Sequence, residues 1–160
     1  MDNIFLNESD VLQESGYTTR EAVRVIVFDE DNKVALYGKE YLLIPGGGVE
    51  DGENLEDACV RECIEEIGCR IASLAKLGVS KEVKSKNNII QNAHYFSAQL
   101  DGEKGEPTTT QENEAMRKVD WLYIKDAIEL IESYKLSAPD LSYNSRFNMY
   151  ANMYYLNKFK

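Results

Sequence analysis

Long apolar runs are missing from this 160-residue sequence, and so are the features of a secretory signal. No stretch approaches the ~20 apolar residues that a membrane-spanning helix needs. The opening segment, MDNIFLNESDVLQESG, carries acidic side chains where a secretory signal has a basic region followed by an apolar one. We therefore expect a cytoplasmic protein that has no membrane partner.

Basic residues are also scarce, because 18 Lys and Arg stand against 28 Asp and Glu and give a formal net charge of −10. Binding to a nucleic-acid polymer depends on clustered basic residues, so this balance argues against such a partner. An acidic protein can still bind small phosphate esters when divalent cations bridge the two negative partners. The composition thus leaves phosphate chemistry open, provided that a metal ion takes part.

Residues that form disulfides or bind zinc are few, since the sequence has three cysteines and one histidine. Cys59, Cys63 and Cys69 lack the even number and wide spacing of a disulfide framework. No CxxC motif occurs, and His94 lies far away in sequence, so a zinc site is not favoured. Buried, reduced thiols are the simpler interpretation.

Apolar periodicity predicts strands and helices within one domain that spans residues 1–160, a length that can bury its own core. Runs of β-branched and apolar residues predict strands at 21–28, 33–38, 70–85, 89–100 and 118–124. The first two should pair as a hairpin, and so should the next two. Helices are predicted at 54–67, 125–133 and 144–158, the last beginning at Asn144 or Ser145. This order is typical of an α/β (α+β) domain with a mixed central β-sheet.

The helix predicted at 54–67 segregates its side chains. Asn54 is a suitable N-cap, and Gly68 is a suitable C-terminal stop. At about 100° per residue, one group of side chains should face the core: Cys59, Val60, Cys63, Ile64 and Ile67. Three glutamates gather on the opposite side: Glu62, Glu65 and Glu66.

Glutamates at this spacing repel one another, and a solvated acidic surface is the ordinary explanation. However, no lysine occurs between Asn54 and Cys69, and Arg61 is the one basic residue of that segment. Clustered carboxylates suit Mg²⁺ or Mn²⁺ better than zinc. The three glycines at 46–48 would let a backbone carbonyl approach the same ion. Neither a P-loop nor a GxGxxG motif is matched here.

The segment LIPGGGVEDGENLEDACVRECIEEIGC resembles the Nudix box, G-x5-E-x7-R-E-U-x-E-E-x-G-U, in which U is an aliphatic residue. Its polar and glycine positions all match: Gly47, Glu53, Arg61, Glu62, Glu65, Glu66 and Gly68. Cys63 and Cys69 stand at the two U positions, where cysteine, a small apolar residue, should keep the packing role. The sequence is therefore similar to the MutT-like Nudix hydrolases, with no subfamily indicated, and the resemblance implies an α-β-α sandwich.

The resemblance implies divalent-metal-dependent hydrolysis of the pyrophosphate bond in a nucleoside diphosphate linked to another moiety, with water attacking phosphorus. The implied cofactor is Mg²⁺ or Mn²⁺. Glu62 and Glu66, with Glu65 beside them, would be the principal metal ligands. The carbonyl of Gly46 would complete part of the shell, and Glu53 would bind through water.

Two catalytic roles also follow from the resemblance. Arg61 is similar to the family arginine that orients a glutamate through a bidentate hydrogen bond, although an ordinary surface ion pair is the alternative. The general base would be Glu62 or a glutamate of the QENEA loop, Glu114 or Glu112. Between the two loop residues we favour Glu114.

The substrate is left open, because no signature of a Nudix subclass is found. The aromatic residues Phe147, Tyr150 and Tyr154 recur at helical spacing, which favours core packing over stacking on a base. A catalytically idle Nudix-like domain that binds a nucleotide and regulates a partner is the alternative function. A homodimer is expected only from family habit.

Overall fold

The computed structural model describes residues 2–7, 16–84, 87–108, 117–138 and 141–160. The strands are β1 (Asp2–Asn7), β2 (Thr18–Phe28), β3 (Lys33–Gly38), β4 (Arg70–Lys84), β5 (Ile89–Asp101) and β6 (Lys118–Tyr123). The helices are α1 (Leu55–Ile67), α2 (Ile124–Ser137), α3 (Tyr143–Leu156) and the short 3₁₀ helix η3 (Asn157–Phe159). No helix in these ranges is long and apolar enough to cross a bilayer.

The strands form one mixed sheet of six in the order β1-β4-β5-β2-β3-β6. β1 runs parallel to β4 and β2 runs parallel to β5, whereas the other neighbours are antiparallel. The mixed sheet and both predicted hairpins, β2–β3 and β4–β5, are therefore confirmed.

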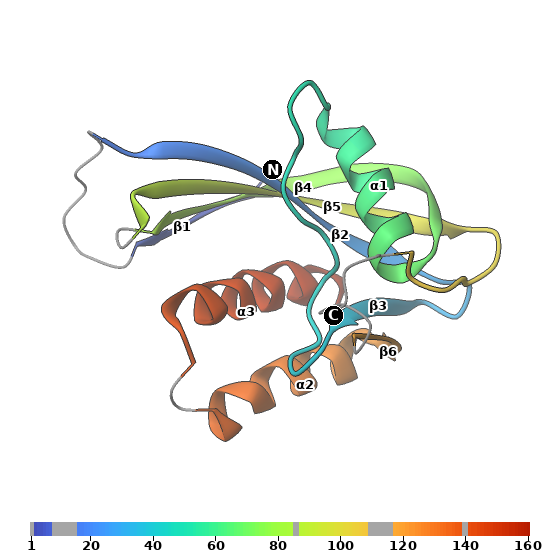
Figure 1. Ribbon diagram of the computed structural model, residues 1–160. Helices are drawn as coiled ribbons and strands as arrows, with labels where there is room; N and C mark the ends of the chain where they lie inside the picture. The colour runs from blue at the N-terminus through green and yellow to red at the C-terminus, as the bar shows by residue number, and fades with distance from the viewer. Residues whose placement is uncertain (1, 8–15, 85–86, 109–116, 139–140) are drawn as a thin grey trace.

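Helices cover both faces of the sheet, with α1 on one side and α2 and α3 on the other (Figure 1). Alternation along β2 explains this arrangement, because successive side chains of a strand point to opposite faces. Val23 and Val25 belong to the apolar cluster that includes α1, whereas Ala22 and Ile26 belong to the cluster that includes α2 and α3. The predicted α-β-α sandwich is confirmed.

The glycine-rich segment 45–49 extends the sheet beside β2. β3 pairs with β2 next to their connecting turn. Farther along β2, Val23 donates its backbone N–H to Gly47 O at 2.9 Å, and Val25 donates to Pro45 O at 2.9 Å. The segment is thereby fixed between β2 and α1, and it forms the floor of the site described below.

The ends of α1 lie where the sequence predicts them. The side chain of Asn54 accepts the N–H of Asp57 at 2.8 Å, and Gly68 ends the helix in the left-handed conformation at φ 65°. The three cysteines in or next to this helix, Cys59, Cys63 and Cys69, are buried free thiols, as expected.

The predicted core face of α1 was wrong at two positions. Val60 and Ile64 are 40% and 37% exposed, whereas Glu62 is only 7% exposed. The reason is the segment 45–49, which packs against the side of α1 that carries Glu62. Helical periodicity alone did not reveal that a loop, rather than solvent, would cover this side.

Other boundaries also differ from the prediction. α2 continues to Ser137, beyond the predicted end at residue 133. The N-cap of α3 is Ser142, whose side chain accepts the N–H of Ser145, instead of Asn144 or Ser145 itself. β1 was not predicted, because its short apolar run lies among acidic and amide residues.

Candidate active site

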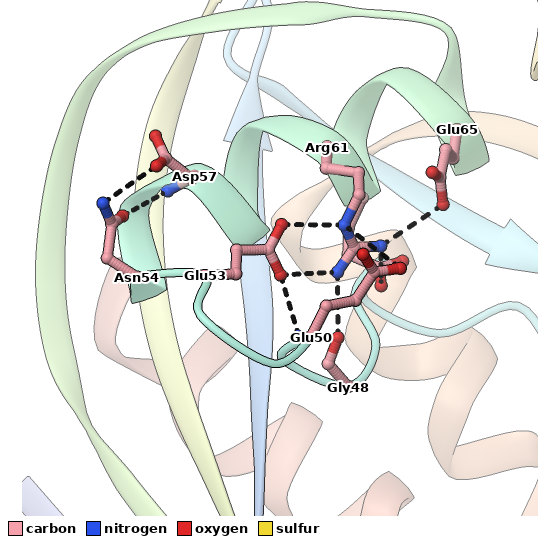
Figure 2. A network of polar contacts seen from close by, with 8 residues as sticks. Gly48, Glu50, Glu53, Asn54, Asp57, Arg61 and Glu65 are labelled. Carbon is pink, nitrogen blue, oxygen red and sulfur yellow. Dashed lines mark hydrogen bonds and ion pairs between the residues drawn. The ribbon is translucent and has the colours of Figure 1, made fainter.

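Arg61 is the centre of the polar network on α1, as Figure 2 shows. Its guanidinium donates to both carboxylate oxygens of Glu53, from Nε at 2.8 Å and from Nη2 at 3.0 Å. Nη2 also donates to the carbonyl of Gly48 at 2.9 Å, and Nη1 donates to Glu62 Oε1 at 2.8 Å and to Glu65 Oε2 at 3.4 Å. Arg61 thus connects three of the motif's glutamates to the glycine-rich segment.

This network changes the ionisation of Glu53. The hydrogen bonds from Arg61 hold the pKa of the Glu53 carboxyl below its usual value, and the backbone N–H of Glu50 contributes in the same direction. Both oxygens of the Glu53 carboxylate therefore already accept hydrogen bonds. This agrees with the expectation that Glu53 would bind a metal ion only through water.

Two other glutamates, Glu62 and Glu66, lie against the glycine-rich segment. Glu66 Oε2 accepts the backbone N–H of Gly46 at 2.8 Å. The carboxylate of Glu62 lies so close to Gly47 that a Cβ at that position would come within 2.7 Å of Glu62 Cδ. Any larger residue at position 47 would therefore displace the Glu62 carboxylate from its present position.

Burial raises the pKa of both carboxyls. For Glu66 the value rises to about 7, mainly through desolvation, and the charge of Glu62 adds to the effect while the Gly46 N–H opposes it. Desolvation also raises the pKa of Glu62, against the hydrogen bond and charge of Arg61. Two desolvated acids that repel each other are a suitable donor set for a hard dication, which would offset both effects.

The structure brings only some of the predicted metal ligands close together. Within the described ranges, no three acidic, cysteine or histidine side chains converge as a preformed metal site. Glu62, Glu66 and the Gly46 backbone lie together, whereas Glu53 and Glu65 join them through Arg61. The predicted general-base residues of the loop, Glu112 and Glu114, lie outside the described residues.

A cleft of about 380 Å³ opens beside Glu66 and Gly46. It lies between the sheet and the C-terminal helices, with Arg24 from β2, Tyr41 from the turn after β3 and Asn148 from α3 in its walls. This volume suits a small-molecule ligand. Among the carboxylates of α1, Glu66 therefore lies in the wall of this cleft.

Arg24 was missed in the sequence, although it is the one basic residue in the apolar run EAVRVIVF. It is half-buried, and its positive charge favours the ionised forms of Glu62 and Glu66. A charged residue in a central strand is unusual enough to have indicated a site.

The sequence did not assign the aromatic residues of the C-terminal helix or the single histidine to the site, and the structure shows that they differ in burial. Phe147 is buried, as core packing predicts, but Tyr150 is 49% exposed, so the packing prediction is wrong there. His94 Nε2 contacts Glu21 Oε2 at 2.5 Å on the α1 side of the sheet.

Comparison with known proteins agrees with this fold and motif. The family model of the NUDIX domain matches residues 18–142, so the chain belongs to the Nudix family. The sandwich resembles the mutator MutT protein from Bacillus halodurans, with a TM-score of 0.53, 24% identity and coverage of 69% of this chain and 72% of that one. It also resembles the MutT Nudix hydrolase from Burkholderia pseudomallei, with a TM-score of 0.55, 21% identity and coverage of 68% and 85%.

One curated relative has a sequence similar to about half of this chain. It is a protein of Bacillus subtilis (strain 168) named "Putative 8-oxo-dGTP diphosphatase", 35% identical over 81 residues. The match covers 49% of this chain and 52% of that protein, so the chain spans about half the length of this curated relative.

Proposed function

We propose that the protein is a pyrophosphohydrolase that uses Mg²⁺ or Mn²⁺ to cleave a nucleoside diphosphate linked to another moiety, with water attacking phosphorus. The observation that carries the proposal is the position of Glu62 and Glu66, two desolvated carboxylates that lie against the glycine-rich segment, where Glu66 also lines the cleft. A bound dication would neutralise the diphosphate and lower the pKa of a coordinated water.

The residues of the chain have distinct roles in this proposal. Glu62, Glu66 and the Gly46 carbonyl would hold the cation, with Glu65 beside them and Glu53 acting through water. Arg61 is already saturated by carboxylate and carbonyl acceptors, so it would position Glu62 rather than bind phosphate.

The general base remains either Glu62 or a loop glutamate, Glu114 or Glu112. Burial raises the pKa of Glu62, which brings it closer to the range in which a carboxylate accepts a proton at neutral pH. This feature supports Glu62, although Glu62 also serves as a proposed metal ligand.

The relative and the cleft both support a proposal for the substrate class. The matched protein's name refers to 8-oxo-dGTP, which supports a nucleoside triphosphate or a related compound as substrate here. The cleft beside Glu66 is large enough for the nucleoside part of such a molecule. We keep a cytoplasmic location and a single domain over residues 1–160 as predictions; the packing of α3 on the same sheet, beyond the matched residues 18–142, supports the latter.

The alternative, a catalytically idle domain that binds a nucleotide and regulates a partner, is less well supported. A purely regulatory site has no need for every acidic position of the hydrolytic motif, yet all of them are present. Both functions predict nucleotide binding, so they differ only in turnover.

Turnover can be measured by mass spectrometry on a panel of nucleoside diphosphate and triphosphate compounds at millimolar Mg²⁺. We expect cleavage that a chelator abolishes and that added Mg²⁺ or Mn²⁺ restores. Glu62→Gln should lower kcat by orders of magnitude, whereas Glu56→Gln, on the exposed side of the same helix, should not. Binding of these compounds without any hydrolysis would instead establish the regulatory alternative.

A further inference from the structure

The second half of β4 carries polar residues on its buried side. Ser80 and Glu82 are 0% and 1% exposed, and in the sheet they stand opposite Ala93 and Gln91 of β5. Paired residues share a face, and Ala93 belongs to the apolar core that α2 and α3 cover. An apolar side chain would be the ordinary choice at position 82.

The polar atoms of these residues are incompletely paired, although Ser80 and Lys84 both lie close enough to Glu82 to favour its ionised form. Glu82 Oε1 and Ser80 Oγ are inaccessible to solvent and make no hydrogen bond with any described residue. Lys84 is the nearest cation, with Nζ 3.8 Å from Glu82 Oε2, but it donates to Gln91 Oε1 at 3.0 Å. A buried acceptor without a donor is destabilising, and such departures are expected where a ligand supplies the missing group.

Arg24 joins this polar group to the cleft. It pairs with Tyr95 of β5 and so projects from the same sheet face as Glu82. Burial raises the pKa of Glu82, and the charges of Lys84 and Arg24 oppose that effect. It also lines the cleft together with Glu66. In the described ranges its only hydrogen bond goes to the neighbouring Val23 O, at 3.0 Å. Arg24 therefore lies beside both the polar group and the cleft.

We propose that Ser80, Glu82 and Lys84 form a specificity-determining subsite that binds two adjacent hydrogen-bond donors on the uncharged part of a nucleotide. The inference rests on the proposed function, because it assumes that the diphosphate lies at Glu62 and Glu66. A carboxylate accepts two parallel donors well. The N1–H and 2-amino groups of guanine provide such a pair, and so do the two hydroxyls of a ribose.

The test is nucleotide selectivity in Glu82→Gln, whose amide offers one acceptor and one donor in place of two acceptors. The matched control is Glu129→Gln, an exposed carboxylate of α2 whose side chain is 64% accessible. For each protein, kcat and KM are measured with GTP, dGTP, ITP and dATP at saturating Mg²⁺. Binding of the corresponding α,β-methylene analogues is measured by calorimetry.

We expect the wild type to prefer the donor-pair nucleotides at least tenfold in kcat/KM, and Glu82→Gln to lose this preference through KM with kcat nearly unchanged. Loss of the GTP-over-ITP preference would place the base at Glu82, and loss of the GTP-over-dGTP preference would place the ribose there. Either result supports the subsite.

Unchanged selectivity, or an equal loss for all four nucleotides, would overturn the subsite while leaving the proposed hydrolysis intact. A wild type that cleaves neither these four nucleotides nor any compound of the wider panel would instead refute the proposed function, and the calorimetric selectivity would still decide the role of Glu82. If Glu82→Gln fails to fold by circular dichroism, the same measurements on Ser80→Ala give the decision.

Discussion

Replacing Glu66 with Gln should remove a pH dependence of stability that has its origin in the proposed metal site. Burial, reinforced by the charge of Glu62, raises the pKa of Glu66 from 4.5 to about 7. Between these values the folded protein holds a proton that the unfolded chain has released. The contribution of Glu66 to stability is therefore complete below pH 4.5 and is lost as the pH rises through about 7.

The size of this free-energy contribution follows from the size of the pKa shift of Glu66. At ~1.4 kcal/mol per pH unit, the full difference corresponds to about 3 kcal/mol at pH 8 in metal-free protein. A glutamine at position 66 keeps an oxygen for the Gly46 N–H but carries no charge to desolvate. Glu66→Gln should therefore match the wild type near pH 4.5 and exceed its stability by up to about 3 kcal/mol at pH 8.

Urea unfolding with a chelator present, followed at intervals between pH 4.5 and 8, measures this difference for wild type, Glu66→Gln and the exposed control Glu56→Gln. Subtracting the wild-type profile of unfolding free energy against pH from that of Glu66→Gln removes the contributions of all other titrating groups. Added Mg²⁺ should stabilise the wild type and leave Glu66→Gln almost unchanged. A flat difference profile, or one that falls with pH, would refute the assignment of a desolvated carboxylate at position 66.

Three further substitutions test the neighbouring contacts. Gly47→Ala would place a methyl group on the carboxylate of Glu62, so we expect Mg²⁺ affinity to fall at least tenfold by calorimetry; unchanged affinity would contradict the packing argument. Arg61→Lys removes the bidentate hydrogen bond to Glu53. We expect kcat to fall roughly 10- to 100-fold, which is the usual effect of disturbing the contacts that support a metal ligand. Wild-type kinetics would show that a positive charge alone suffices at this position. Asn54→Ala should cost about 1 kcal/mol in urea unfolding with kcat unaltered, and a loss of activity would mean that the cap also orders the site.

Strong local signals allowed most of the fold to be predicted from the sequence. The N-cap at Asn54 and the stop at Gly68 bound α1 correctly, because capping depends on adjacent residues. The mixed sheet followed from strand order and hairpin turns. β1 was missed because its pairing partner, β4, lies some 75 residues away in sequence, and nothing local indicates such a contact.

The site was predicted less completely than the fold. The spacing of the motif predicted Glu62 and Glu66 as site residues, and the structure places both against the glycine-rich segment. Helical periodicity, however, assigned Glu62 to the solvent side, although it is only 7% exposed. That error has a physical cause: periodicity reports the polarity of a face and does not report what covers it. Arg24 and the polar face of β4 were missed for the same reason, since their significance depends on neighbours in other strands.

The backbone hydrogen bonds between β2 and the segment 45–49 allow local opening of this segment to be detected by hydrogen exchange. The amide hydrogens of Val23, Val25 and Val49 are shared between the two pieces of chain, from opposite sides of the same ladder. Their exchange with deuterated water should be slow only while the segment stays in place. Loosening around the acidic residues would thus appear as faster isotope uptake in a core strand, which makes local opening measurable without any ligand.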